Sequence, residues 1–334
     1  DELANKYSPI RTMDMFNMIG ERKKPQPGCA PILSDELTDE TDTAFYVLAR
    51  QAGEGGDRKA EKGDYYMSDI EIESIKLLSE KFAKLILVIN SGGIVDLSII
   101  DQVRVDAVIF YGQAGVSGGD AFADLITGKV NPSGHLTDTW AMSYEDYPSA
   151  ATYSHVNGEV EYENYYEGCY VGYRYFSEFN VKPRYPFGYG LSYTNFTHQV
   201  NNIIINGTVI TVETSVKNVG GYKGKEVLQL YLDGELVAFN KTKTLDIGEE
   251  TKLQLSFDMA ENGSLDEKRH AFVLHSGEYG LAIGNQFTDD PFAVLSLDRE
   301  VITELVSQIT EKPDFDDMKS DKLRVFGQEL PRYK

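Results

Sequence analysis

Residues 85–89 read Leu-Ile-Leu-Val-Ile, an apolar run without a polar position. Such a run is typical of a strand buried on both faces, as in parallel sheets covered by helices. Two runs of the same kind lie outward from it, Ala44-Phe-Tyr-Val-Leu-Ala49 and Ala107-Val-Ile-Phe-Tyr111, and helical stretches cover 68–82 and 121–127. This alternation predicts an α/β sandwich with a mostly parallel sheet.

The helix expected over 68–82 carries its own start signal. Ser68-Asp-Ile-Glu71 is a capping box, in which Ser68 accepts a hydrogen bond from the backbone of Glu71 while Glu71 reaches back to the backbone of Ser68. Ile72, Ile75 and Leu78 then recur at helical spacing. We therefore expect a helix to begin directly after Ser68.

After residue 183 the hydrophobic pattern changes to short runs with a period of two. These runs are separated by turn residues and cover 208–216, 226–232, 252–257, 271–275 and 280–284. Alternating runs at such intervals predict an antiparallel β-sandwich, with an immunoglobulin-like topology as the default expectation.

These patterns divide the chain into an α/β portion over 1–150, a tyrosine-rich connector over 151–184, a β-sandwich over 185–297 and a charged tail or linker over 298–334. The connector has two interpretations. Its rings either line a sugar-binding surface or pack the domains together, and packing is favoured because each ring buries a large area and leaves its hydroxyl in water. In the tail we expect a helix from Val301 to Ile309, followed by an extended linker.

The composition excludes several classes of partner. The formal charge of the 334 residues is −21, from 53 acidic and 32 basic side chains, and no basic stripe interrupts it. A surface this negative repels nucleic acids and anionic membranes. No apolar run approaches the roughly 18 residues that span a bilayer. We therefore expect no nucleic-acid partner and no membrane partner.

Neither cysteines nor histidines are spaced like metal ligands. Cys29 and Cys169 are far apart and form no Cys-x-x-Cys motif, and the five histidines show no paired spacing. We expect no metal and no cofactor.

The chain begins at Asp1, with neither a methionine nor a charged-then-apolar leader, which predicts a processed or truncated piece. The compartment stays open between cytoplasmic and secreted, with cytoplasmic slightly favoured.

Two glycine-rich stretches are open to a functional interpretation. GEGGDR at 53–58 sets one carboxylate, Glu54, among three glycines, which indicates a loop that bends tightly or approaches another group closely. Gly115-Val-Ser-Gly-Gly119 faintly resembles a phosphate-binding loop. It lacks the P-loop lysine and the full dinucleotide fingerprint, so a tight turn is favoured there.

Five blocks, in this order along the chain, resemble the glycoside hydrolase family 3 β-glucosidases: GEGGDR at 53–58, KGDYYMSD at 62–69, QAGVSGGDAFADLITGKVNPSGHLTDTW at 113–140, YYEGCYVGYRYF at 165–176 and YPFGYGLSYTNF at 185–196. The resemblance covers nearly all of residues 31–296. It implies part of an (α/β)6 sandwich followed by a fibronectin type III-like β-sandwich. It also implies a retaining mechanism, with an aspartate nucleophile on a TIM barrel and an acid/base carboxylate on a loop of the (α/β)6 domain.

The resemblance places Glu54 at the position of the acid/base. A retaining glycosidase needs two carboxyl groups about 5–5.5 Å apart, one of which protonates the leaving oxygen. Gly53, Gly55 and Gly56 give the loop freedom to reach across a domain interface, and desolvation against sugar and barrel is expected to raise the pKa of Glu54. The neighbouring Asp57 and Arg58 either pair with each other or bind sugar hydroxyls, and a structural ion pair is favoured over substrate contact.

This sequence departs from the family's usual architecture because some of the family's domains are missing from it. We find no TIM-barrel sequence in these residues, and we expect the first half of the (α/β)6 domain to be missing from them as well. The expected partner is therefore a TIM-barrel domain or chain of the same enzyme, supplied either as a separate chain or, in a circular permutation, after the linker-like 312–334. The expected substrate is a β-linked oligosaccharide, and a homodimer is left open.

The main functional hypothesis is part of a β-glucosidase or exo-β-glucanase that removes terminal glucose from short β-glucans or cellodextrins, as in cellulose degradation. The alternative is a non-catalytic module that binds a glycan or a protein. An N-acetylglucosaminidase of the same family is a weaker third hypothesis. Family members of that kind that lack the second domain take their acid/base from a His-Asp pair on the barrel, whereas this chain keeps the domain that bears the glutamate. Glucose, xylose and arabinose stay open as the terminal sugar.

Overall fold

The computed structural model describes residues 31–50, 57–158, 160–307, 318, 326–327 and 329–334. The chain divides into two compact units. The α/β unit runs to Ala123 and includes 142–144, and the β unit holds 124–141 and the residues from Glu145 onward. Within the described ranges, no helix combines the length and the apolar character that crossing a membrane requires.

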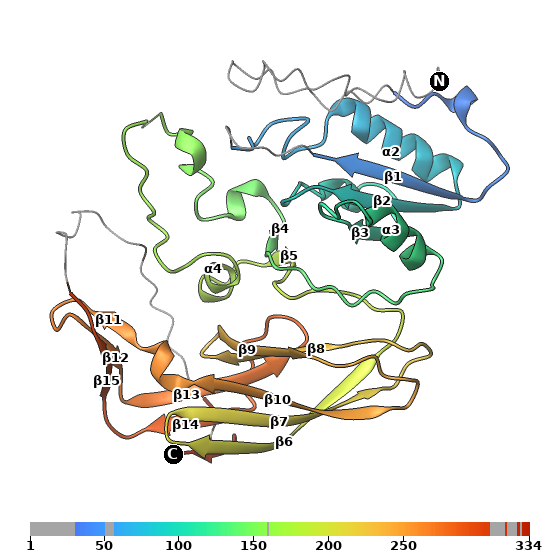
Figure 1. Cartoon of the computed structure of the whole chain (residues 1–334). Coiled ribbons are helices and arrows are strands. Elements are labelled where there is room, and N and C mark those ends of the chain that lie inside the picture. The colour runs from blue at the N-terminus through green and yellow to red at the C-terminus, as the bar shows by residue number, and fades with distance from the viewer. Residues whose placement is uncertain (1–30, 51–56, 159, 308–317, 319–325, 328) are drawn as a thin grey trace. The chain divides into compact units, whose positions relative to one another are not determined.

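In the described part of the α/β unit, three parallel strands lie in the order β1 (Thr43–Ala49), β2 (Lys84–Asn90) and β3 (Ala107–Phe110). Helix α2 (Asp69–Lys81) connects β1 to β2, and α3 (Gly118–Ile126) follows β3. Figure 1 shows α2 and α3 on opposite sides of this sheet. The three predicted strands and both predicted helices are present, and the predicted parallel pairing is confirmed for these strands.

Burial differs between the strands of this sheet. Central strand β2 is buried along most of its length, as predicted. On β1, Tyr46 and Leu48 are buried, whereas Phe45 and Val47 on the other face are 43% and 54% exposed. The expectation that every strand is buried on both faces is therefore wrong for β1, and also for β3, none of whose four residues is buried. Both are edge strands of the described sheet, whereas β2 is flanked on each side. On the more exposed face of β1, Phe122 of α3 contacts Phe45, with ring centroids 6.2 Å apart.

Local sequence signals set the starts of both helices. The Ser68 hydroxyl accepts a 3.3 Å hydrogen bond from the Glu71 amide, and Glu71 Oε2 accepts a 2.7 Å bond from the Ser68 amide, which confirms the capping box. Before α3, Gly115 has φ +71°, and the Gly118 amide donates to its carbonyl at 3.2 Å. A Cβ at Gly118 would lie 2.8 Å from that of Ala114 and would clash with the Tyr111 hydroxyl. The glycines thus serve a tight turn.

Among the residues of the β unit that the structure describes, the strands form two larger sheets and two small ones. A three-stranded sheet has the order β10-β7-β6, and a five-stranded sheet has the order β16-β14-β13-β8-β9. Their strands are β6 (Phe196–Asn206), β7 (Val209–Asn218), β8 (Val227–Leu232), β9 (Glu235–Lys241), β10 (Glu250–Asp258), β13 (Gly277–Gly284), β14 (Ala293–Leu297) and β16 (Arg332–Tyr333). All pairs in these two sheets are antiparallel except β14 with β16.

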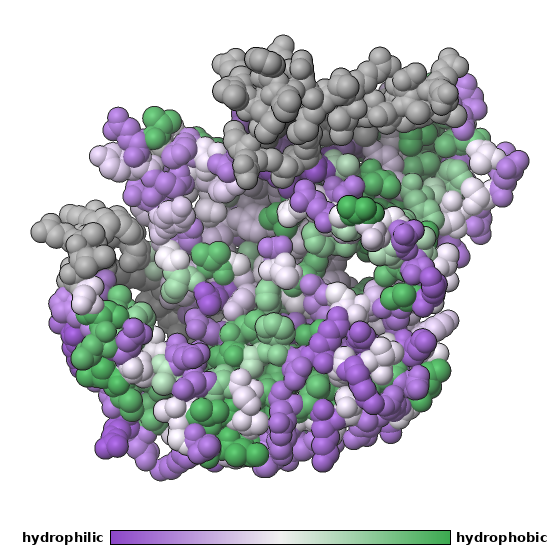
Figure 2. Space-filling view, viewed as in Figure 1, coloured by the Kyte–Doolittle hydropathy of each residue, from purple (hydrophilic) through white to green (hydrophobic). Residues whose placement is uncertain are grey.

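The remaining elements are short. They comprise β4 (Trp140–Ala141) paired with β5 (Pro183–Tyr185), the sheet of β11 (Ser264–Asp266), β12 (Ala271–Leu274) and β15 (Val301–Leu305), the helix α4 (Tyr173–Glu178), and 3-10 helices at Ser34–Glu36, Ser98–Asp101, Tyr144–Asp146, Tyr153–His155 and Met259–Asn262. The small β11-β12-β15 sheet leaves Leu265, Ile302 and Leu305 exposed, and Figure 2 shows hydrophobic surface at the edge where Figure 1 places these strands.

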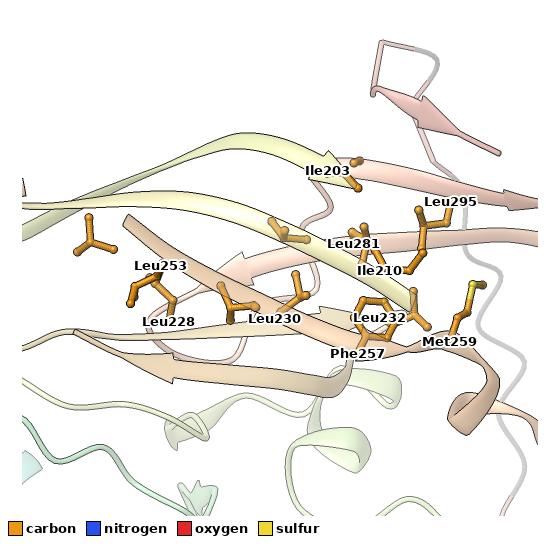
Figure 3. Packing of buried hydrophobic residues seen from close by; sticks show 14 of the residues in the cluster. Ile203, Ile210, Leu228, Leu230, Leu232, Leu253, Phe257, Met259, Leu281 and Leu295 are labelled. Carbon is orange, nitrogen blue, oxygen red and sulfur yellow. The ribbon is translucent and has the colours of Figure 1, made fainter. Parts of the chain in front are cut away.

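The two larger sheets bury one hydrophobic core between them. Figure 3 shows side chains from both sheets in this core, among them Ile210 of β7, Phe257 of β10, Leu230 of β8 and Leu281 of β13. Leu230 and Leu281 are fully buried. This arrangement is the sandwich of antiparallel strands that the period-two runs predict.

The prediction for the tail is wrong at two places. Val301–Leu305, expected as helix, is strand β15, whose Val301 and Ile302 pair with Leu274 and Val273 of β12. Its β-branched residues favour extended backbone, and an isolated helix this short is marginal in water. Arg332–Tyr333, expected as linker, forms β16 and pairs with Val294 and Leu295 of β14.

Candidate active site

The predicted acid/base Glu54 lies outside the described residues, as do all of residues 51–56. The structure describes both ends of this segment, Arg50 directly after β1 and Asp57 with Arg58 beyond it. The segment therefore follows the carboxyl end of a parallel strand, which is the edge where α/β sheets generally hold their ligands. Cys29 also lies outside the described residues, and Cys169 is an exposed free thiol.

Arg50 anchors the first end of the segment. Its guanidinium forms a bidentate pair with Glu71, with Nη1–Oε1 at 2.7 Å and Nη2–Oε2 at 3.0 Å. The two side chains are 2% and 1% exposed. Arg50 Nε donates to the carbonyl of Asp64 at 2.5 Å, and its own amide donates to Asn90 of β2 at 2.9 Å. The carboxylate that caps α2 thus also neutralises a buried arginine.

Arg58 anchors the second end. Nε donates to Asp64 Oδ1 at 2.8 Å, Nη2 to the Asp64 carbonyl at 2.9 Å, and Nη1 to the Ile94 carbonyl at 2.6 Å. All three nitrogens thus have protein partners, which supports a structural ion pair for Arg58, formed with Asp64. Asp57 is exposed. Substrate contacts of Asp57 and Arg58 stay a prediction.

Asp64 connects the two anchors. Its carbonyl accepts from both Arg50 and Arg58, and its carboxylate accepts from Arg58 and from the Lys59 amide at 2.7 Å. The segment around it is packed by Tyr65, whose ring lies edge-on to those of Tyr66 and Tyr144 at 5.0 and 5.1 Å. The sequence-based reasoning missed the roles of Arg50 and Asp64. An arginine directly after an apolar strand, and an acid within the KGDYYMSD block, were the available signals.

The tyrosine-rich connector contains two kinds of ring. Tyr173 packs against Phe187 and Phe287 with ring centroids 4.8 and 5.1 Å apart, and Tyr170 lies edge-on to Phe179 at 5.3 Å. Tyr162 and Tyr165, in contrast, are largely exposed. Packing thus accounts for the later tyrosines of the connector.

The β unit holds a second, largely buried ion pair. His135 Nε2 lies 3.5 Å from Glu226 Oε1, and Nδ1 lies 2.5 Å from the Gly188 carbonyl oxygen. Burial of the ring and the charge of Lys241 oppose protonation, but the hydrogen bonds to Glu226 and Gly188 outweigh them and raise the pKa of His135. Among the described residues, no group of three or more histidine, cysteine or acidic side chains could hold a metal ion.

This pair makes the stability of the β unit depend on pH. A raised pKa in the folded state means that protonated His135 stabilises the fold below the unfolded value of 6.5. The contribution is lost as pH rises through the folded pKa. We expect His135→Asn to lower the free energy of unfolding more at about pH 5.5 than at about pH 8.5, measured by urea unfolding with Trp140 fluorescence. An equal loss at both pH values would contradict this assignment.

Comparison with known proteins places the chain in a family. Residues 34–193 match the glycosyl hydrolase family 3 C-terminal domain. The chain therefore carries a C-terminal portion of glycosyl hydrolase family 3, as the five sequence blocks predict.

Individual relatives are β-glucosidases. The chain is 34% identical to a beta-glucosidase of Ruminococcus albus over 76% of this chain and 28% of the relative, and 32% identical to beta-glucosidase A of Butyrivibrio fibrisolvens over 87% and 41%. Beta-glucosidase 3B from Thermotoga neapolitana, solved in complex with alpha-D-glucose, superposes with a TM-score of 0.75 at 33% identity, over 90% of this chain and 45% of that one. The chain spans less than half the length of each of these relatives.

Proposed function

We propose that this chain is the part of a retaining β-glucosidase that supplies the general acid/base Glu54 to an aspartate nucleophile on a TIM barrel. The observation that carries the proposal is the position of Glu54. In the sequence, Glu54 lies within the matched family 3 region, four residues after Arg50, which directly follows β1, and four residues before Arg58; these two arginines both bond to Asp64. A module that only bound a glycan or a protein would need no acid there.

The chemistry assigns a separate task to each carboxyl group. The barrel aspartate attacks the anomeric carbon, while Glu54 protonates the leaving oxygen and later activates water; the two carboxyl groups of such a pair lie about 5–5.5 Å apart. The substrate is a terminal β-linked glucose on a short oligosaccharide, a proposal supported by the β-glucosidase names of the relatives. Asp57 and Arg58 are proposed to contribute to binding this sugar at the barrel interface.

The same proposal covers the domains and the partner. The α/β unit corresponds to part of an (α/β)6 sandwich, and the β unit to a fibronectin type III-like domain. A tyrosine-rich connector over 151–184 and a tail over 298–334 flank the β-sandwich. The partner is the TIM barrel of the same enzyme, as a domain or a chain.

The barrel requirement can be tested directly. Because the isolated chain holds only one carboxyl group of the pair, we expect it to show negligible hydrolysis of an aryl β-glucoside. Supplying the barrel part of the same enzyme should give turnover, whereas the barrel with the Glu54→Ala chain should give far less. Measurable turnover by the isolated chain would refute the division of the catalytic pair.

A further inference from the structure

We infer that Asp64 is a positioning residue, which holds both ends of the segment bearing Glu54 and thereby fixes where the acid/base carboxyl group is delivered. This inference rests on the proposed function. It assigns to Asp64 a role in catalysis through Glu54, without contact with the substrate.

The contacts of Asp64 reach both sides of the segment. Arg50 lies before it and Arg58 after it, and both donate to the same carbonyl oxygen, at 2.5 and 2.9 Å. The carboxylate adds two bonds on the far side, from Arg58 Nε and the Lys59 amide. Bonds from guanidinium groups are roughly twice as strong as neutral ones. The Asp64 carbonyl therefore joins the two ends, and the Asp64 carboxylate adds two bonds that fix the Arg58 end.

Asp64 is itself well fixed. Its side chain is 11% exposed, and its amide donates to the Glu61 carbonyl at 3.2 Å. The next residue, Tyr65, accepts a 2.9 Å bond from the Asp96 amide, in the loop after β2. Arg58 bonds the same loop at Ile94. The segments that follow two adjacent parallel strands are thus joined at one edge of the sheet, and Asp64 stands where they meet.

Fixed ends matter for proton transfer. A catalytic group displaced by about 1 Å can cost about a hundredfold in rate, even when the change lies away from the chemistry. Glycine as a residue type adopts more backbone conformations than any other, and three glycines are neighbours of Glu54 in the sequence. Restraint at both ends of this glycine-rich segment limits the range over which Glu54 can be placed.

The test uses Asp64→Asn with a matched control. Asparagine has the size of aspartate but only one acceptor oxygen, so it cannot accept from both Arg58 Nε and the Lys59 amide. Because the charged guanidinium is the stronger donor, the oxygen should stay with Arg58 and the Lys59 amide should lose its acceptor. The control is Asp106→Asn. Asp106 likewise accepts from an arginine, Arg104, and from a backbone amide, that of Leu85 at 2.8 Å, but at the opposite, amino ends of the strands. It is more exposed, at 36%.

The first measurement is made on this chain alone. Hydrogen exchange at the Lys59 amide should become about tenfold faster or more in Asp64→Asn, because its acceptor is lost, and should be unchanged in Asp106→Asn. The amides of β2 should keep their protection in Asp64→Asn. Unchanged exchange at Lys59 would overturn the restraint, whatever the activity of the complete enzyme.

The second measurement is made on the complete enzyme. Asp64→Asn should lower kcat by about tenfold to a hundredfold on a glucoside with a poor leaving group, and much less on an activated aryl glucoside that needs no proton. KM should change little. In a Glu54→Ala background, Asp64→Asn should cost nothing further. The positioning role would be overturned if Asp64→Asn lowered kcat equally on both glucosides. It would also be overturned if Asp64→Asn lowered kcat in the Glu54→Ala background as much as it does in the wild type.

The two proposals can fail separately. If Glu54→Ala leaves turnover intact, the proposed function is wrong, and the Lys59 exchange rate still decides whether Asp64 restrains the segment. If Glu54→Ala removes activity and Asp64→Asn changes neither exchange nor the dependence on leaving group, only the inference about Asp64 is wrong.

Discussion

Glu54→Ala in the complete enzyme should lower kcat on glucosides with poor leaving groups by about 10²–10⁴-fold, the usual contribution of a general acid. Without a proton donor, the leaving oxygen must depart as an alkoxide, which is slow for a sugar or an alkyl group. An activated aryl leaving group departs without protonation, so glycosyl transfer to the nucleophile should be much less affected on such a substrate. Steady-state kinetics on a series of leaving groups measures this difference.

Azide provides the positive control. It needs no general base to attack the glycosyl-enzyme intermediate, so it should partly restore turnover of the activated substrate by Glu54→Ala. Glu61→Ala removes an exposed carboxylate seven positions along the chain and should leave both rates near those of the wild type. Unchanged rates in Glu54→Ala would favour the non-catalytic module.

Glu71→Ala is expected to destabilise the α/β unit by about 3–5 kcal/mol, because it leaves the buried Arg50 charge without its partner. The variant also removes the carboxylate that accepts from the Ser68 amide at the start of α2. Hydrogen exchange of the β2 amides is the suitable measurement, since the single tryptophan, Trp140, lies in the β unit.

Two further variants test whether the unpaired charge of Arg50 causes the loss of stability in Glu71→Ala. Glu73→Ala, on the exposed side of the same helix, should change the free energy of unfolding by less than about 0.5 kcal/mol. The double variant Arg50→Met with Glu71→Leu should recover much of the loss, because it removes both buried charges together. A small effect of Glu71→Ala would mean that water reaches and solvates Arg50 in its absence.

Much of the fold could be predicted because its signals are local. The apolar run of β2 and the capping box of α2 each identify an element from a few adjacent residues. Strands β6, β9 and β14 were not predicted, since their exposed or short patterns carry weaker signals. Tail strand β15 needs the edge of β12, which no local pattern reveals.

In the candidate site, too, local sequence signals predicted some features, while others depend on the fold. Glu54 was predicted from its glycine-rich block, and its role stays a prediction because it lies outside the described residues. The partner of Arg58 was not predicted. Sequence proximity suggests Asp57, whereas folding brings Asp64, six positions away, to the guanidinium.

Hydrophobic period and turn residues, which act within short windows, were enough to predict the order of the α/β and β units, whereas the family and the candidate acid Glu54 were predicted from the resemblance of five motif blocks. The pairing of Glu71 with Arg50, and the bonds of Asp64 to both Arg50 and Arg58, depend on the fold. The physical reason is that pairing β1 with β2 brings the carboxyl ends of both strands to one edge of the sheet. A buried charge must find a partner there, and the folded backbone selects which one.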